Sequence, residues 1–101
     1  MALLVCANGR LEEIVLPEGD LAQLKKLQEL VGGFIELRRI LSYVAEYGSF
    51  QMMFLNEEQR GLPANMIATA ICANGRWLSG AVPSWDQIVG DVVLCKSGEV
   101  S

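Results

Sequence analysis

The sequence predicts a small α+β domain in which two helices pack on one face of a mainly antiparallel or mixed sheet of about five strands. Three observations lead to this expectation. The chain has 101 residues, the length of one domain, so residues 1–101 are expected to form a single globular unit. Apolar residues make up 51% of the chain, enough for one core. Short apolar runs and helical repeats follow one another in the order β-β-α-β-β-α-β.

The chain is expected to open with two antiparallel strands joined by a tight turn. Ala2–Cys6 and Leu11–Leu16 are apolar runs, and Asn8 and Gly9 lie between them. Asn-Gly between two apolar runs is a strong hairpin signal, because both residues accept a positive φ. The Pro-Glu-Gly segment that follows is expected to end the second strand.

A helix is expected to start at Asp20. This residue is a good N-cap, and Gln23 stands three residues further on, at the spacing of a capping box. Gly32 can take the left-handed conformation that closes a helix, and Gly33 then lets the chain turn into a strand. Five apolar residues recur at helical spacing and form the expected buried stripe: Leu21, Leu24, Leu27, Leu30 and Val31.

Two further strands are expected at Phe34–Leu41 and Phe50–Leu55, with a loop or hairpin connection at Ser42–Ser49. Successive residues of a strand point to opposite faces of the sheet, and Phe50–Leu55 is mostly apolar on both. Such a strand is central in its sheet or covered by a partner.

The second half of the chain predicts one helix, one loop and one strand. Pro63 fits the first position of the second helix. Trp77–Trp85 contains turn formers and has no period, which indicates a loop. Ile88–Cys95 is the expected last strand, with Gly90 as a bulge or a place of close backbone approach. Four apolar residues form the expected buried stripe of the second helix: Met66, Ile67, Ala70 and Ile71.

Composition and charge exclude several classes of protein. The chain has no histidine, which excludes Ser-His and Cys-His nucleophile systems and most zinc sites. Twelve acidic and eight basic residues give a net charge of −4 without a basic stripe, so duplex nucleic acid is not an expected partner. No apolar run approaches the ~20 residues of a membrane helix, and the N-terminus lacks the features of a signal peptide. We therefore expect a cytoplasmic protein without a membrane partner.

The remaining chemistry-bearing residues do not predict an enzyme, a metal site or a cofactor. Cys6, Cys72 and Cys95 are far apart, whereas metal sites usually show a close pair, so we expect buried thiols in a reducing compartment. Neighbouring carboxylates, such as Glu57 and Glu58, point to opposite sides of an extended chain and do not converge by themselves. The sequence also lacks a Gly-rich phosphate loop and a nucleophile elbow.

Two places have a rationale for ligand binding. One is the polar turn before the second helix, where free backbone N–H groups and the helix dipole favour an anion. The other is the loop that carries Trp77 and Trp85, which can stack on a base or enter a partner interface. Ordinary turn and capping chemistry is the alternative for the first place, and a cap over the core for the second. The candidate ligand-binding residues of the polar turn are Asn56, Glu57, Arg60, Gly61, Leu62, Pro63 and Asn65.

Four blocks of sequence carry a resemblance to a known family: Leu27–Glu36, Leu55–Glu58, Gly61–Asn65 and Ile88–Leu94. In this order they resemble the domain of unknown function 3846, a family of small proteins of phages, plasmids and bacteria. The similarity runs from about Leu11 to Leu94. Ser42–Ser49 and Trp77–Trp85 have no counterpart in the family pattern. The resemblance implies a mobile-element setting and no catalytic activity.

Two functions are expected from these observations. The first is a non-catalytic antagonist of host defence, a homo-oligomer that binds and sequesters a small anionic, nucleotide-type ligand. The alternative is a protein–protein inhibitor or adaptor that docks on a partner, such as a host defence protein, through its acidic surface and the Trp77–Trp85 loop. A hydrolase or transferase built from convergent carboxylates is less favoured, because no nucleophile or base is visible.

Overall fold

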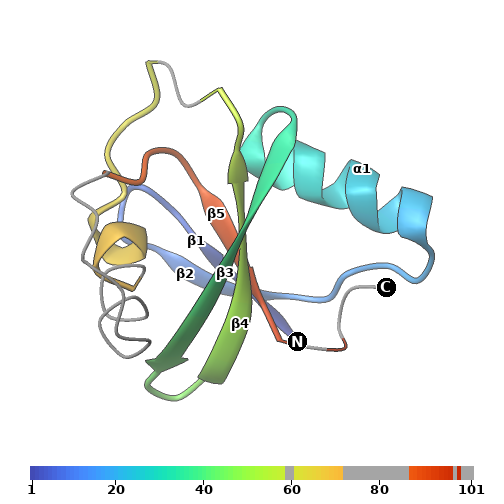
Figure 1. The fold of residues 1–101 in the computed structure, drawn as a ribbon, viewed down its shortest axis with the longest axis horizontal. Coiled ribbons are helices and arrows are strands. Elements are labelled where there is room, and N and C mark those ends of the chain that lie inside the picture. Colours follow the sequence, from blue (N-terminus) through green and yellow to red (C-terminus); the bar gives the residue numbers. More distant parts are fainter. Residues whose placement is uncertain (59–60, 72–86, 97, 99–101) are drawn as a thin grey trace.

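In the computed structural model, the described residues 1–58, 61–71, 87–96 and 98 form a five-stranded antiparallel sheet with helices on both sides (Figure 1). The strand order is β2-β1-β5-β4-β3. The α+β class and the predominantly antiparallel sheet are therefore as predicted. A helical segment at residues 66–71 lies between β4 and β5 in the sequence. The labelled elements are β1 (Ala2–Val5), β2 (Leu11–Ile14), α1 (Asp20–Val31), β3 (Ile35–Val44), β4 (Gly48–Asn56) and β5 (Val92–Cys95).

The β1–β2 hairpin forms where the Asn-Gly signal predicts it. Val5 pairs with Leu11, and Gly9 has a φ of 94° and donates its N–H to the carbonyl of Cys6 at 2.9 Å. Asn8 does not share the positive φ. Its side-chain Oδ1 instead accepts a hydrogen bond from the backbone N–H of Arg10 at 2.9 Å, a local bond that stabilises the turn.

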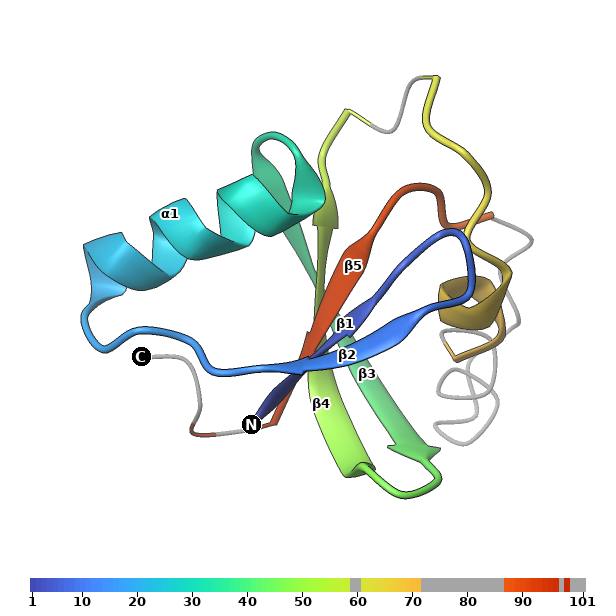
Figure 2. The ribbon, with the colours of Figure 1, turned by 180° about the vertical axis from the view of Figure 1, so that it is seen from behind.

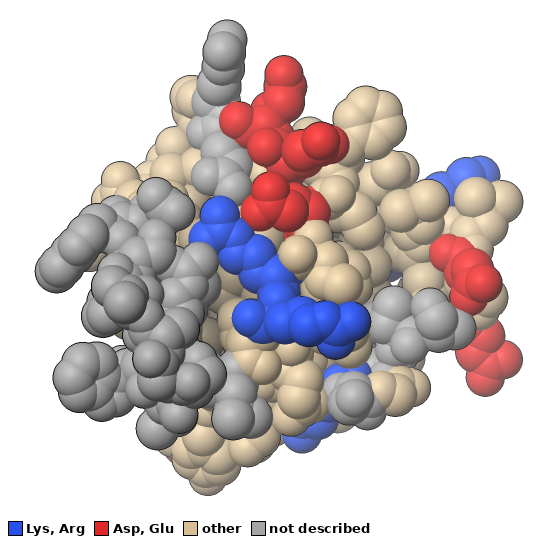
Figure 3. All heavy atoms as spheres, viewed as in Figure 1, with Lys and Arg blue, Asp and Glu red and all other residues tan. Residues whose placement is uncertain are grey.

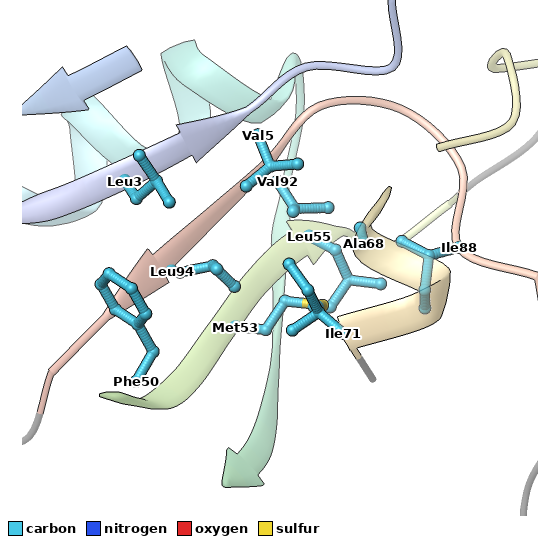
Figure 4. Close-up of a cluster of buried hydrophobic side chains, with 10 residues drawn as sticks. All are labelled: Leu3, Val5, Phe50, Met53, Leu55, Ala68, Ile71, Ile88, Val92 and Leu94. Atoms are coloured by element: carbon cyan, nitrogen blue, oxygen red, sulfur yellow. The ribbon is translucent and has the colours of Figure 1, made fainter. Parts of the chain in front are cut away.

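The two helices cover opposite faces of the sheet, so the expectation that both lie on one face is wrong (Figure 2). α1 contributes Leu27 and Val31 to one cluster, while segment 66–71 contributes Ala68 and Ile71 to the other. The inner strands require this arrangement, because β1 and β5 are buried at every residue and so carry apolar side chains on both faces. Figure 4 shows the buried side chains on the face of segment 66–71.

Helix α1 begins and ends at the predicted residues, but its N-terminal cap and its buried side differ from the prediction. Gly19 occupies the N-cap, and no side chain caps the helix, so the Asp20–Gln23 capping box does not form. Gly32 closes the helix in the left-handed conformation, as predicted. Leu21 is 66% exposed, and the buried residues are Gln23, Leu27 and Val31.

The β3–β4 hairpin is longer than predicted, because β3 continues to Val44 and β4 starts at Gly48. Only a short turn remains of the connection expected at Ser42–Ser49. β4 pairs with β5 on one side and β3 on the other, which confirms the interior position predicted from its two apolar faces. β3 lies at the outer edge of the sheet.

The segment before the second helix starts differently from the prediction. Pro63 does not open the helix. Ala64 forms a β-bridge with Val89, and helical residues begin only at 66. The last strand is also shorter than the predicted Ile88–Cys95. β5 covers only Val92–Cys95, because Val89 forms the isolated bridge with Ala64.

Two of the three cysteines, Cys6 and Cys95, are buried, as predicted, while Cys72 lies outside the described residues. In the part of the chain that the structure describes, no helix has the length and apolarity needed to span a bilayer.

Candidate functional site

Three segments far apart in the sequence meet around one cavity of about 240 Å³, where α1 ends. They are the last turn of α1, the Leu62-Pro63 segment, and the turn that leads into β5. All three belong to the blocks that carry the family resemblance. We call this cavity the α1-end cavity; its lining residues are Glu29, Leu30, Val31, Gly32, Leu62, Pro63, Gly90 and Asp91.

Asn56 connects the end of β4 to the end of α1. Its side-chain Nδ2 donates to the carbonyl oxygen of Val31 at 3.2 Å, and its Oδ1 accepts from the N–H of Glu58 at 2.9 Å. Gly33 packs directly on this amide, since a Cβ at Gly33 would lie 2.9 Å from Asn56 Nδ2. Asn56 is 8% exposed, so it shapes the wall beside the cavity and presents little surface to a ligand. Glu57 is exposed, and its N–H donates to the carbonyl of Phe34 at 2.8 Å.

Asn65 is fully buried, and both polar atoms of its side chain form hydrogen bonds within the chain. Its Nδ2 donates to the carbonyl oxygens of Val5 at 2.9 Å and Gly90 at 2.8 Å. Its Oδ1 accepts from the N–H of Ala68 at 3.0 Å, the geometry of a helix N-cap. Asn65 therefore joins β1, the turn before β5 and the second helix, and its side-chain amide has no donor left for a ligand.

Gly90 contacts Leu62 and Pro63, and all three residues line the α1-end cavity. Gly90 has a φ of 76°, and its N–H donates to the carbonyl of Pro63 at 2.8 Å. A Cβ at Gly90 would lie 2.9 Å from Leu62 Cδ1, so Leu62 would have to shift, and the positive φ itself disfavours any residue but glycine. This confirms the close backbone approach predicted at Gly90. Leu62 and Pro63 line the cavity as apolar walls.

The electrostatics of the α1-end cavity favour a cation. Glu29 is exposed in the last turn of α1, where the helix dipole is negative, and that turn holds no basic residue. Asp91 also lines the cavity, and its Oδ1 accepts a hydrogen bond from the N–H of Ala7 at 2.9 Å. Figure 3 shows further acidic atoms over the upper ends of β3 and β4. The cavity therefore combines apolar walls with a negative rim.

Arg10, on the turn between β1 and β2, is a basic residue whose surroundings raise its pKa. The pKa of Arg10 is raised, first by a hydrogen bond from its guanidinium to Cys6 Sγ at 3.9 Å and then by nearby charges that include Glu12 and Asp91. Arg10 lies on the exposed hairpin turn and forms an ion pair of 3.5 Å with Glu12. It does not line the α1-end cavity.

The remaining predicted site residues are not brought together by the described structure. Arg60, Trp77 and Trp85 lie outside the described residues. Gly61 has a φ of 70° and faces open space. Sequence reasoning placed Leu62 and Pro63 in the site but missed Glu29 and Asp91. Their position in the sequence could have indicated them, because Glu29 and Asp91 both lie in blocks that carry the family resemblance.

Comparison of the chain with family models, curated proteins and solved structures gives no match. The resemblance to the domain of unknown function 3846 therefore stays an expectation. Across residues 1–58, 61–71, 87–96 and 98, no group of three or more Cys, Asp or Glu side chains is placed to hold a metal ion. The site is thus defined by its shape, its apolar walls and its two carboxylates.

Proposed function

We propose that this protein is a non-catalytic binding module, an inhibitor or adaptor, that takes a basic side chain of a partner protein into the α1-end cavity. The observation that carries this proposal is that Glu29 and Asp91 line the same cavity as the apolar residues Leu30, Leu62 and Pro63, at the negative end of α1. A lysine or arginine side chain combines an apolar stem with a charged tip. Its stem matches Leu30, Leu62 and Pro63, and its tip matches the two carboxylates.

Charge supports a basic ligand over the anionic, nucleotide-type ligand that the sequence suggested first. An anion in the α1-end cavity would share it with Glu29 and Asp91, and like charges repel most strongly where water is partly excluded. Asn65, one of the expected donors, is already bonded to Val5, Gly90 and Ala68. Among the described lining residues, the cavity therefore has no side-chain donor for an anion.

The size of the cavity supports a side chain over a whole nucleotide. Pockets that enclose drug-sized ligands measure about 300–1,000 Å³. The α1-end cavity, at about 240 Å³, is smaller than that range. It suits one side chain from a partner whose remaining surface rests on the rim. From the resemblance alone, we further propose that this partner is a protein of the host cell, such as a defence protein.

Calorimetric titration with an acetylated tetra-arginine amide peptide at low salt tests the proposal. The variant with both Glu29→Gln and Asp91→Asn should bind this peptide about twofold to thirtyfold more weakly than the wild type, because exposed ion pairs contribute about 0.2–1 kcal/mol each. Asparagine at 91 keeps an oxygen that can accept the hydrogen bond from Ala7, so the fold is expected to persist.

The matched control removes two exposed carboxylates elsewhere, with Glu13→Gln and Glu18→Gln. This variant has the same net charge as the cavity variant, and it should keep nearly all of the peptide affinity. An equal loss in both variants would show a general attraction to an acidic protein and would contradict the proposal. Tight binding of a nucleotide instead of the peptide would favour the sequestration function.

A further inference from the structure

The outer edge of β3 offers a surface for strand pairing. β3 is ten residues long and stands last in the sheet order, so within the described residues it pairs with β4 alone. An edge strand presents unpaired N–H and C=O groups that can hydrogen-bond to another strand. Short edge strands and bulges normally limit such pairing, and β2, at the other edge of this sheet, is only four residues long.

A bulge divides β3 into a regular part and an irregular part. The ladder with β4 is regular from Ile35 to Arg39, and its register shifts between Arg39 and Ser42. The flat part available to a further strand is therefore Ile35–Arg39, with Leu37 at its midpoint. Beyond it, the bulge changes the direction and twist of the strand.

Charged residues flank this midpoint on one face of the sheet. Glu36 pairs with Leu55 and Arg38 with Met53, so both charges lie on the face of segment 66–71. Arg38 Nε donates to Glu36 Oε2 at 3.1 Å. Leu37 points to the opposite face and is 44% exposed. Figure 3 shows basic atoms directly below the acidic atoms in this part of the molecule.

We propose that a second copy of this chain pairs with the outer edge of β3, antiparallel and centred on Leu37. When a two-fold axis stands perpendicular to the sheet at residue 37, residue 36 of one copy is opposite residue 38 of the other. Glu36 of each copy then faces Arg38 of the second copy, and Leu37 faces Leu37. The result is a continuous ten-stranded sheet, five strands from each copy.

Charge selects this register among its neighbours. A two-fold axis at residue 36 would place Glu36 against Glu36, and an axis at residue 38 would place Arg38 against Arg38. Like charges directly opposite each other destabilise a strand pair, whereas opposite charges stabilise it. Only the centre at Leu37 uses the whole regular stretch and also gives two reciprocal pairs of opposite charge.

Two single variants, tested apart and together, give a direct test by sedimentation equilibrium from about 1 µM to about 1 mM protein. The Glu36→Arg chain carries two arginines around Leu37, and the Arg38→Glu chain carries two glutamates. Each variant alone should be monomeric, because its own copies oppose like charges. Their equimolar mixture should form a 1:1 heterodimer, and the wild type should form a homodimer.

Folding and specificity are controlled in the same experiment. Circular dichroism of each variant establishes that it is folded, and Arg39→Glu serves as the matched variant. Arg39 lies on the other face and would be opposite Ile35 of the second copy, so this variant should dimerise within about threefold of the wild type. A wild type that stays monomeric across the range would overturn the proposal. Folded single variants that dimerise like the wild type, or a mixture that stays monomeric, would also overturn it.

Discussion

Asn65 shows how one buried polar residue can organise three parts of the chain. Its side chain accepts from the first turn of the second helix and donates to the carbonyls of Val5 and Gly90. The hydroxyl of Thr69 adds to this junction, because it donates to the Asn65 carbonyl at 2.8 Å and accepts from the N–H of Ile88 at 2.9 Å. A buried amide is stable only when its donors and acceptors are all bonded. Asn65 meets that condition.

We expect Asn65→Ala to lower the free energy of unfolding by about 2–4 kcal/mol, since it removes a helix cap and leaves two buried carbonyls without this donor. Urea unfolding followed by circular dichroism measures the change. Asn8→Ala is the control: Asn8 makes one exposed bond to Arg10, and its loss should cost less than about 1 kcal/mol. Equal effects of the two substitutions would contradict the structural role of Asn65.

The sequence shows only part of what Asn65 does. An asparagine before an apolar helical repeat indicates a cap, and the capping bond to Ala68 is local. Its two other partners lie 60 and 25 residues away in the chain, so no local pattern indicates them. The same residue was therefore open to interpretation as a ligand donor. Gly90, in contrast, was predictable, because a glycine inside an apolar run often marks a close backbone approach.

At the scale of elements, α1 shows where helical periodicity misleads. Leucines 21, 24 and 27 follow a helical spacing, yet Leu21 and Leu24 are exposed and Gln23 is buried. Figures 1 and 2 show the reason: the start of α1 lies further from the sheet than its end, so the sheet covers only part of the helix. The tilt of a helix depends on tertiary contacts that a repeat does not encode.

We expect Leu27→Ala to lower the free energy of unfolding by about 2–4 kcal/mol, because Leu27 is 2% exposed in the core under α1. Leu21→Ala should change it by less than about 0.5 kcal/mol, since Leu21 is largely exposed. Both values come from urea unfolding of the purified variants. If Leu21→Ala lowered the free energy of unfolding as much as Leu27→Ala does, Leu21 would pack against the sheet as the sequence predicted, and the observed orientation of α1 would be contradicted.

For the whole molecule, the two-sided sheet explains both the fold and the site. The sequence predicted the interior position of β4 from its two apolar faces, and the same reasoning implies a cover on each face. The prediction nevertheless placed both helices on one face, and the structure has one on each. The face that a helix covers depends on how the connections cross the sheet, which no local pattern in the sequence encodes. The α1-end cavity follows from this layout. The end of α1 on one face meets the Leu62-Pro63 segment and the Gly90-Asp91 turn, which the β-bridge between Ala64 and Val89 holds together.

We propose above that the α1-end cavity receives a basic side chain. The most direct measurement is a ¹H–¹⁵N nuclear magnetic resonance titration of the labelled protein with acetylated arginine amide, with adenosine monophosphate as the anionic comparison. The arginine compound is expected to shift the amide signals of Gly32, Gly90 and Asp91 most strongly, and these shifts should weaken as salt screens the carboxylates. The proposal would be contradicted if acetylated arginine amide mainly shifted amide signals outside the cavity, or if only adenosine monophosphate shifted the cavity amides.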